Sequence, residues 1–210
     1  MGIKELITIL KQEFSKTLPG FDSQKKLAPE SRHNLRDLSQ AVNPKKSAVL
    51  ILLFPVNGEV YVPFIKRVTD GSMHSGQIAF PGGKLENYDN NLTETALREA
   101  EEEIGIDKES VEVIRKLTPL YIPVSNFYVQ PVVGFIETKP NFIIDKNEVD
   151  ELYNVSLNEL NKAEIINKRF KVRNVEIKAP FFVLNEIEIW GATAMILKEF
   201  IDIIKNIYKN

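Results

Sequence analysis

The feature that most constrains the fold is a pair of apolar runs joined by Asn57 and Gly58. Residues 48–56 and 59–68 are rich in Val, Ile, Leu and Phe, which favour β-strands. An Asn-Gly pair readily adopts the left-handed backbone conformations of a two-residue turn, and it is the strongest short-range hairpin signal. The two runs therefore predict an antiparallel β-hairpin, which begins the compact part of the chain.

Hydrophobic periodicity and turn residues predict the other elements. We expect helices at residues 3–17, 93–104 and 192–208, the second with Thr93 as its N-cap and Gly105 as its C-cap. We expect strands at residues 111–117, 128–137, 170–175 and 177–184, the last two as a hairpin, and one or two short helical turns at 148–163. Residues 20–46 and 69–92 lack a regular pattern and are expected to be irregular.

The order of these helices and strands along the chain predicts an α/β protein with a mixed β-sheet sandwiched between helices (α/β/α). We assign residues 1–46 to an N-terminal helix and irregular segment that pack on a domain of residues 47–210.

Composition narrows the classes of function. The chain has 210 residues, of which 43% are hydrophobic, enough for the core of one domain. Because the sequence contains no cysteine, it excludes disulfides, a thiolate nucleophile and a cysteine zinc site. A formal net charge of -2 gives no broad basic field, so we expect no nucleic-acid partner. The pattern predicts no signal peptide and no membrane span, and we expect a cytoplasmic protein.

Three glutamates of the predicted helix at 93–104 carry the main chemical signal. Glu99, Glu102 and Glu103 are spaced i, i+3, i+4, so their carboxylates project from one face of a helix. Clustered carboxylates repel one another, and Mg²⁺, which takes oxygen ligands and keeps several waters, would neutralise them. The alternative is an exposed, charge-rich helix in which Arg98 and Glu102 form an ordinary ion pair.

The context of this helix favours the metal site. Residues 98–106, REAEEEIGI, resemble the second half of the Nudix box, R-E-U-x-E-E-x-G-U with U aliphatic or small, at every position. The first half, which starts at Gly83, departs from the box: Asp89 stands where the box has Glu, and one residue is inserted before Arg98. We therefore interpret Asp89 as a loop-structuring side chain and not as a metal ligand. The resemblance implies the Nudix fold.

A further resemblance points to the coenzyme A pyrophosphatase branch of this family. Residues 74–83, HSGQIAFPGG, look like that branch's H-x-G-Q-I-x-F-P-G-G, and residues 190–194, WGATA, resemble the start of its last helix. The resemblance covers roughly residues 47–200. The branch's own pattern is incomplete here, because Val68 replaces Ser or Ala and Ser72 replaces a second arginine.

The resemblance implies roles for individual residues. The metal ligands would be Glu99, Glu102 and Glu103. The catalytic residues would be Glu102, as a further ligand or the general base, Arg98, which orients a glutamate, and Glu148, which together with Glu151 is an alternative base. The substrate-binding residues would be Arg67, His74, Gly82, Gly83 and Lys84. Arg67 has an alternative role in a strand-end salt bridge, His74 as a hydrogen-bonding scaffold, and Trp190 is expected to pack at the start of the last helix.

The implied reaction is hydrolysis of a P–O–P bond by metal-activated water in a nucleoside diphosphate linked to another group. Mg²⁺ is the implied cofactor, with Mn²⁺ as its alternative. Coenzyme A or an acyl-CoA would give 3′,5′-ADP and 4′-phosphopantetheine. The alternatives are NADH, ADP-ribose or an oxidised nucleotide as the substrate, and a non-catalytic ligand-binding regulator of Nudix-like fold. The partner is a small nucleotide, and a homodimer is compatible with the sequence.

Overall fold

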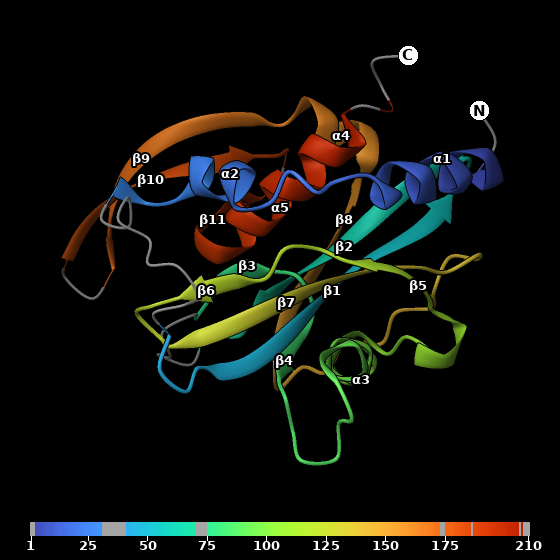
Figure 1. Cartoon of the computed structure of the whole chain (residues 1–210), viewed down its shortest axis with the longest axis horizontal. Helices are drawn as coiled ribbons and strands as arrows, with labels where there is room; N and C mark the ends of the chain where they lie inside the picture. Colours follow the sequence, from blue (N-terminus) through green and yellow to red (C-terminus); the bar gives the residue numbers. More distant parts are fainter. Residues whose placement is uncertain are drawn as a thin grey trace.

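Two sheets and the helices around them make up the part of the chain that the structure describes (Figure 1). The structure is a computed structural model that describes residues 3–30, 41–69, 75–172, 175–185, 187–205 and 207. Its helices are α1 (Ile3–Ser15), α2 (Phe21–Gln24), α3 (Leu92–Ile104), α4 (Leu157–Lys162) and α5 (Gly191–Ile204), with 3-10 turns at Lys25–Leu27 and Lys108–Ser110. The larger sheet contains β1 (Lys45–Val56), β2 (Glu59–Arg67), β3 (Ile78–Ala79), β4 (Gly82–Lys84), β5 (Glu112–Lys116), β6 (Leu120–Ile122), β7 (Phe127–Phe135) and β8 (Val149–Ser156). The smaller sheet contains β9 (Glu164–Val172), β10 (Val175–Val183) and β11 (Glu188–Trp190).

Strand β1 is the centre of the larger sheet. It runs parallel to β7 and antiparallel to β2, so the sheet is mixed. Alternate side chains of a strand point to opposite faces, and both faces of β1 are buried. Leu50 and Leu52 contribute to one core, whereas Ile51 and Leu53 contribute to the other. Burial on both faces explains why residues 48–56 form a continuous apolar run.

Helices cover both faces of this sheet. Helix α3 packs on one face through Ala96, Ala100 and Ile104, which share a core with Leu50 and Leu52. Helices α1, α2 and α5 lie on the opposite face (Figure 1). The main path of the sheet is β3-β2-β1-β7-β5, with β4 on β1, β6 on β7 and β8 on β2. The predicted α/β/α architecture with a mixed sheet is confirmed. Among the helices that the structure describes, none is long and apolar enough to cross a membrane.

A buried carboxylate ties the N-terminal segment to this second face. Glu199 of α5 is 0% exposed and accepts hydrogen bonds from Gln24 Nε2 at 2.8 Å and from Thr118 Oγ1 at 2.7 Å. The backbone N–H of Gly20 donates to the same carboxylate at 3.2 Å. Residues 20–24 thus pack on this face of the sheet, while the division of the chain after residue 46 stays a prediction.

The predicted hairpin is confirmed. Strands β1 and β2 pair Val56 with Glu59 around Asn57 and Gly58, whose φ angles of 50° and 85° are left-handed, as a type I′ turn requires. The three predicted helices are present as α1, α3 and α5, with shifted ends. The predicted C-terminal hairpin is present as β9 and β10, although β9 begins at Glu164.

The prediction of one or two short helical turns at residues 148–163 is confirmed for the second half only, where α4 lies. The first half is strand β8, which pairs with β2 from Ser156 opposite Tyr61 to Val149 opposite Arg67, and only α4 is helical. Pairing with a neighbouring strand outweighs local propensity, and a local pattern does not reveal the partner. The segments predicted as irregular contain α2, β3 and β4, and the short strands β6 and β11 were also missed. Each has two to four residues, too few to show a hydrophobic period.

Candidate active site

Helix α3 is fixed at both ends by its own sequence. The N-cap is Asn91 and not the predicted Thr93, because the Asn91 side chain accepts hydrogen bonds from the backbone N–H groups of Thr93 at 2.9 Å and Glu94 at 3.2 Å. The Asn-x-x-Glu pattern at 91–94 is related to a capping box, a signal that identifies this start in the sequence. At the other end Gly105 has a φ of 69°, which confirms the predicted C-cap.

Glu103 is the buried acid of the site. Its side chain is 1% exposed. One carboxylate oxygen, Oε2, accepts the backbone N–H of Gly82 at 2.7 Å, and the other, Oε1, accepts from Arg67 Nη1 at 3.0 Å. Burial raises the pKa of Glu103 to about 7, against the lowering effects of the Gly82 hydrogen bond and of Arg67. The neighbouring carboxylates of Glu99 and Glu148 raise this pKa further.

The two glycines of β4 make room for this arrangement. Gly82 has a φ of 154°, and a Cβ added there would lie 2.3 Å from the carbonyl oxygen of Ala48. A Cβ added at Gly83 would lie 2.2 Å from Glu99 Oε2. The glycines therefore allow β4 to approach both β1 and the carboxylate of Glu99. Contact of Gly82 and Gly83 with a substrate phosphate stays a prediction.

Arg98 organises the other carboxylates. Its Nε and Nη2 donate to the two oxygens of Asp89 at 2.9 and 3.0 Å, and this bidentate pair lowers the pKa of Asp89 to about 2. Arg98 also contacts Glu99 at 2.8 Å and Glu102 at 2.8 Å, and donates to the carbonyl oxygen of Lys84 at 3.0 Å. Asp89 further accepts from the loop backbone at Glu86. The interpretation of Asp89 as a loop-structuring residue is confirmed.

The three box glutamates lie in different surroundings. Glu103 is buried, Glu99 is mostly buried with a side chain 14% exposed, and Glu102 points outward with a side chain 57% exposed. Burial raises the pKa of Glu99, and the charge of Arg98 opposes this shift. The i, i+4 pair of Arg98 and Glu102 is present, so the ordinary ion pair coexists with the buried carboxylates.

These carboxylates fit a hard divalent cation in chemistry. Such ions take oxygen ligands, and the negative charges of Glu99 and Glu148 lie close enough to Glu103 to raise its pKa. Among the described residues, however, no three acidic side chains already converge as an ion site. Metal binding by Glu99, Glu102 and Glu103 stays a prediction.

Two acidic candidates for the general base differ in their partners. Glu148 lies just before β8, with a side chain 53% exposed and Oε2 at 4.0 Å from Arg67 Nη2. Glu151 is the third residue of β8, and its carboxylate accepts hydrogen bonds from Lys66 Nζ at 2.7 Å and from the hydroxyl of Tyr153. Those bonds lower the pKa of Glu151. The geometry thus brings Glu148 toward the buried carboxylates and holds Glu151 on Lys66.

The loop before β4 is anchored to the core by Phe80. Phe80 is buried, and its ring centroid lies 4.8 Å from that of Phe64 on β2. His74 lies outside the described residues, so its predicted substrate contact has no counterpart here. Trp190 directly precedes α5 and stacks on Phe181 with ring centroids 5.9 Å apart, which agrees with the expected packing role.

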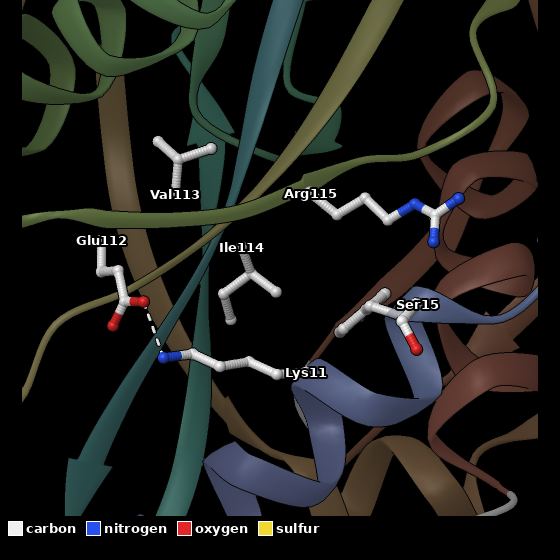
Figure 2. Close-up of a pocket in the computed structure, with 7 residues that line it drawn as sticks. Lys11, Ser15, Glu112, Val113, Ile114 and Arg115 are labelled. Atoms are coloured by element: carbon white, nitrogen blue, oxygen red, sulfur yellow. Dashed lines mark ion pairs between the residues drawn. The ribbon is translucent and has the colours of Figure 1, made fainter.

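A separate hollow lies between α1 and β5, outside this cluster of carboxylates (Figure 2). Lys11 and Glu112 form an ion pair of 2.6 Å across it, and Ile114 and Arg115 complete one side. Arg115 also donates to the carbonyl oxygen of Lys16. None of these residues belongs to the predicted site, and the contacts join the N-terminal helix to the edge of the sheet.

The fold and the site together define an α/β protein with a glutamate-rich helix packed beneath a Gly-Gly strand. The family model of the NUDIX domain matches residues 44–174. An uncharacterized Nudix hydrolase, NudL, of Yersinia pestis is 34% identical over 157 residues, which cover 73% of this chain and 77% of that protein. The chain therefore belongs to the Nudix hydrolase family.

Two other relatives differ in coverage. Nudix hydrolase 3 of Caenorhabditis elegans is 28% identical over 95% of this chain and 87% of its own length. NudL of Pectobacterium atrosepticum is 46% identical, but over 45% of this chain, which spans about half (48%) of that relative. Among solved structures, a MutT protein from Methanosarcina mazei aligns with a TM-score of 0.47 at 17% identity, over 75% of this chain and 92% of that one. The assignment to the family rests on the sequence matches.

Glu103 makes the stability of the protein depend on pH. Its pKa rises from an ordinary 4.5 to about 7 on folding, so folding favours the protonated form. The stability gained is fully present below about pH 4.5 and is lost as the pH rises through 7. At about 1.4 kcal/mol per pKa unit, the free energy of unfolding in chelator should fall by about 2 to 3 kcal/mol more in the wild type than in Glu103→Gln between pH 5 and 8.

The measurement is urea unfolding at both pH values in EDTA. Glu5→Gln, at an exposed position of α1, is the matched control, and its pH dependence should follow the wild type. An equal pH dependence of wild type and Glu103→Gln would show that the Glu103 pKa is not raised.

Proposed function

We propose that the protein is a divalent-metal-dependent pyrophosphohydrolase that cleaves the P–O–P bond of a nucleoside diphosphate linked to another group. The observation that carries this proposal is the buried Glu103 carboxylate, which has Glu99 and Glu148 as negative neighbours. Placing buried carboxylates side by side costs free energy, and a cation that binds between them would offset this cost. Groups with such perturbed pKa values are typical of functional sites. The Nudix box resemblance at residues 98–106 supports the same assignment.

Glu99 and Glu103 would hold the ion, with Glu102 as a further ligand after it leaves Arg98. A bound Mg²⁺ or Mn²⁺ would neutralise the diphosphate and lower the pKa of a water. Arg98 would keep Glu99 in place through their ion pair, since its own position is fixed by the bidentate contact with Asp89.

Glu148 is our candidate for the general base. It is half-exposed and lies on the side of Glu103 and Arg67, so a water between substrate and protein could reach it. Glu102 remains the alternative, because it is also exposed and sits on the same helix as the proposed ligands.

Coenzyme A or an acyl-CoA is the proposed substrate. The support is the string at residues 74–83 and Arg67 at the end of β2, next to the carboxylates. Arginine recognises phosphate as a planar fork, and Arg67 is the arginine that the branch's pattern retains. NADH, ADP-ribose and oxidised nucleotides share the diphosphate and are the competing substrates.

A chromatographic turnover assay tests the substrate and the metal helix together. With Mg²⁺, coenzyme A should yield 3′,5′-ADP and 4′-phosphopantetheine, whereas NADH, ADP-ribose and 8-oxo-dGTP should react more slowly. Glu103→Gln should lose at least about 100-fold in kcat/KM, because it removes a proposed ligand. Preferred cleavage of another substrate would refute the coenzyme A assignment, and substrate binding without cleavage of any would favour the ligand-binding regulator.

A matched pair of variants tests the general base. Glu148→Gln should lower kcat by about 10² to 10⁴, the usual contribution of a positioned base, whereas Glu151→Gln should stay within about threefold of the wild type. Both changes remove one carboxylate near the end of β2, so the pair separates chemistry from the loss of negative charge. Nearly full activity of Glu148→Gln would shift the base to Glu102.

A further inference from the structure

We propose that Arg67 and a divalent cation are alternative partners of Glu103, so that arrival of the cation releases the Arg67 guanidinium to bind the substrate's diphosphate. This inference rests on the proposed metal-dependent function. It joins the two roles considered for Arg67, a salt bridge and a phosphate ligand, as two positions of one side chain.

A cation that binds Glu103 would meet the Arg67 guanidinium at the same buried carboxylate, where the two positive charges repel each other. The carboxylate is buried, and each of its oxygens already accepts a hydrogen bond, one from Gly82 and one from Arg67. The Gly82 N–H is fixed, because Gly82 lies opposite Val49 in the β1–β4 pair, and its Cα lies too close to β1 to carry a side chain. Arg67 is therefore the partner that can give way.

The two arginines of the site differ in how firmly they are held. Arg98 has a side chain 12% exposed and makes a bidentate pair with Asp89 as well as contacts with Glu99 and Glu102. Arg67 has a side chain 32% exposed, one hydrogen bond to Glu103 and a looser contact of 4.0 Å with Glu148. Arg98 is built into the site, whereas Arg67 already borders solvent, where a phosphate would arrive.

The backbone of β2 is irregular at Arg67, next to Glu148. The pairing of β2 with β8 shifts between Lys66, opposite Glu151, and Arg67, opposite Val149, so the strand is irregular at this point. Such irregularities re-aim a side chain beside many active sites. The next residue, Val68, donates its N–H to the carbonyl oxygen of Glu148 at 3.1 Å. The backbone thus holds Arg67 beside Glu148 while the long side chain stays able to turn.

This exchange couples the two ligands. A cation on Glu103 frees the guanidinium for a phosphate, and a phosphate that engages the guanidinium removes a competitor of the cation. Because such coupling is reciprocal, each ligand should strengthen binding of the other. The protein would then bind the metal more tightly when substrate is present, and the substrate more tightly when metal is present.

Direct Mn²⁺ binding tests the exchange without using activity. Free Mn²⁺ is measured by electron paramagnetic resonance in titrations of the wild type, Arg67→Gln and Lys66→Gln. Lys66 is the neighbouring cation on the same strand, paired with Asp150 and Glu151, so its variant controls for the loss of one positive charge. We expect Arg67→Gln to bind Mn²⁺ about three- to tenfold more tightly than the wild type, and Lys66→Gln to stay within about twofold.

Unchanged or weaker Mn²⁺ binding by Arg67→Gln would overturn the exchange and assign Arg67 to holding Glu103 for the metal; the proposed function would stand, because the wild type still binds. Wild-type protein that binds no Mn²⁺ would overturn both. If Arg67→Gln does not fold, Arg67→Lys replaces it. Its single ammonium cannot contact Glu103 and Glu148 as a fork does, so Mn²⁺ should bind at least twofold more tightly than in the wild type, and equal or weaker binding would contradict the proposal.

Discussion

The site depends on one buried hydrogen bond, from the Gly82 N–H to Glu103 Oε2. It joins β4, which pairs with β1 at the centre of the sheet, to α3, which covers that sheet. The bond places a carboxylate where burial raises its pKa to about 7, and the absence of a side chain at Gly82 permits the approach. Because burying this charge costs free energy, the carboxylate needs a positive partner, and Arg67 supplies it in this structure.

Two arginines divide the acidic side chains between them. Arg98 holds Asp89, Glu99 and Glu102 from within the α3 layer, and Arg67 reaches Glu103 from the end of β2. The first arrangement is nearly buried and multiply bonded, and it gives the loop before α3 its shape. The second is partly exposed, and within the described residues the Arg67 side chain makes one hydrogen bond, to Glu103, and a looser contact with Glu148. The contrast separates a scaffold, which should stay in place through the reaction, from a contact that can exchange.

The sequence predicted those parts of the fold that local chemistry determines. Asn57 and Gly58 identified the hairpin, Gly105 the end of α3, and the apolar run at 48–56 the first strand of that hairpin. Residues 98–106 likewise identified the carboxylate helix and its family. Strand β8 was missed because its partner β2 lies more than 80 positions away, and such pairing leaves no local period.

The connections within the site were less predictable. Spacing on a helix showed that Glu99, Glu102 and Glu103 share a face, but not that one would be buried and another exposed. That difference comes from β4, which lies against Glu103 and Glu99, and from Arg67 of β2, which bonds Glu103. The pairing of Glu151 with Lys66, which separates it from Glu148, also depends on the alignment of two strands distant in sequence.

The proposed reaction depends on Glu99 and Glu103 binding the catalytic cation. Anomalous scattering from a crystal of the protein grown with Mn²⁺ would locate that cation. We expect an anomalous peak at about 2.0 to 2.3 Å from carboxylate oxygens of both glutamates, with the Arg67 guanidinium moved off Glu103. A Mn²⁺ peak bound elsewhere, with Glu103 still held by Arg67 and Gly82, would contradict this expectation.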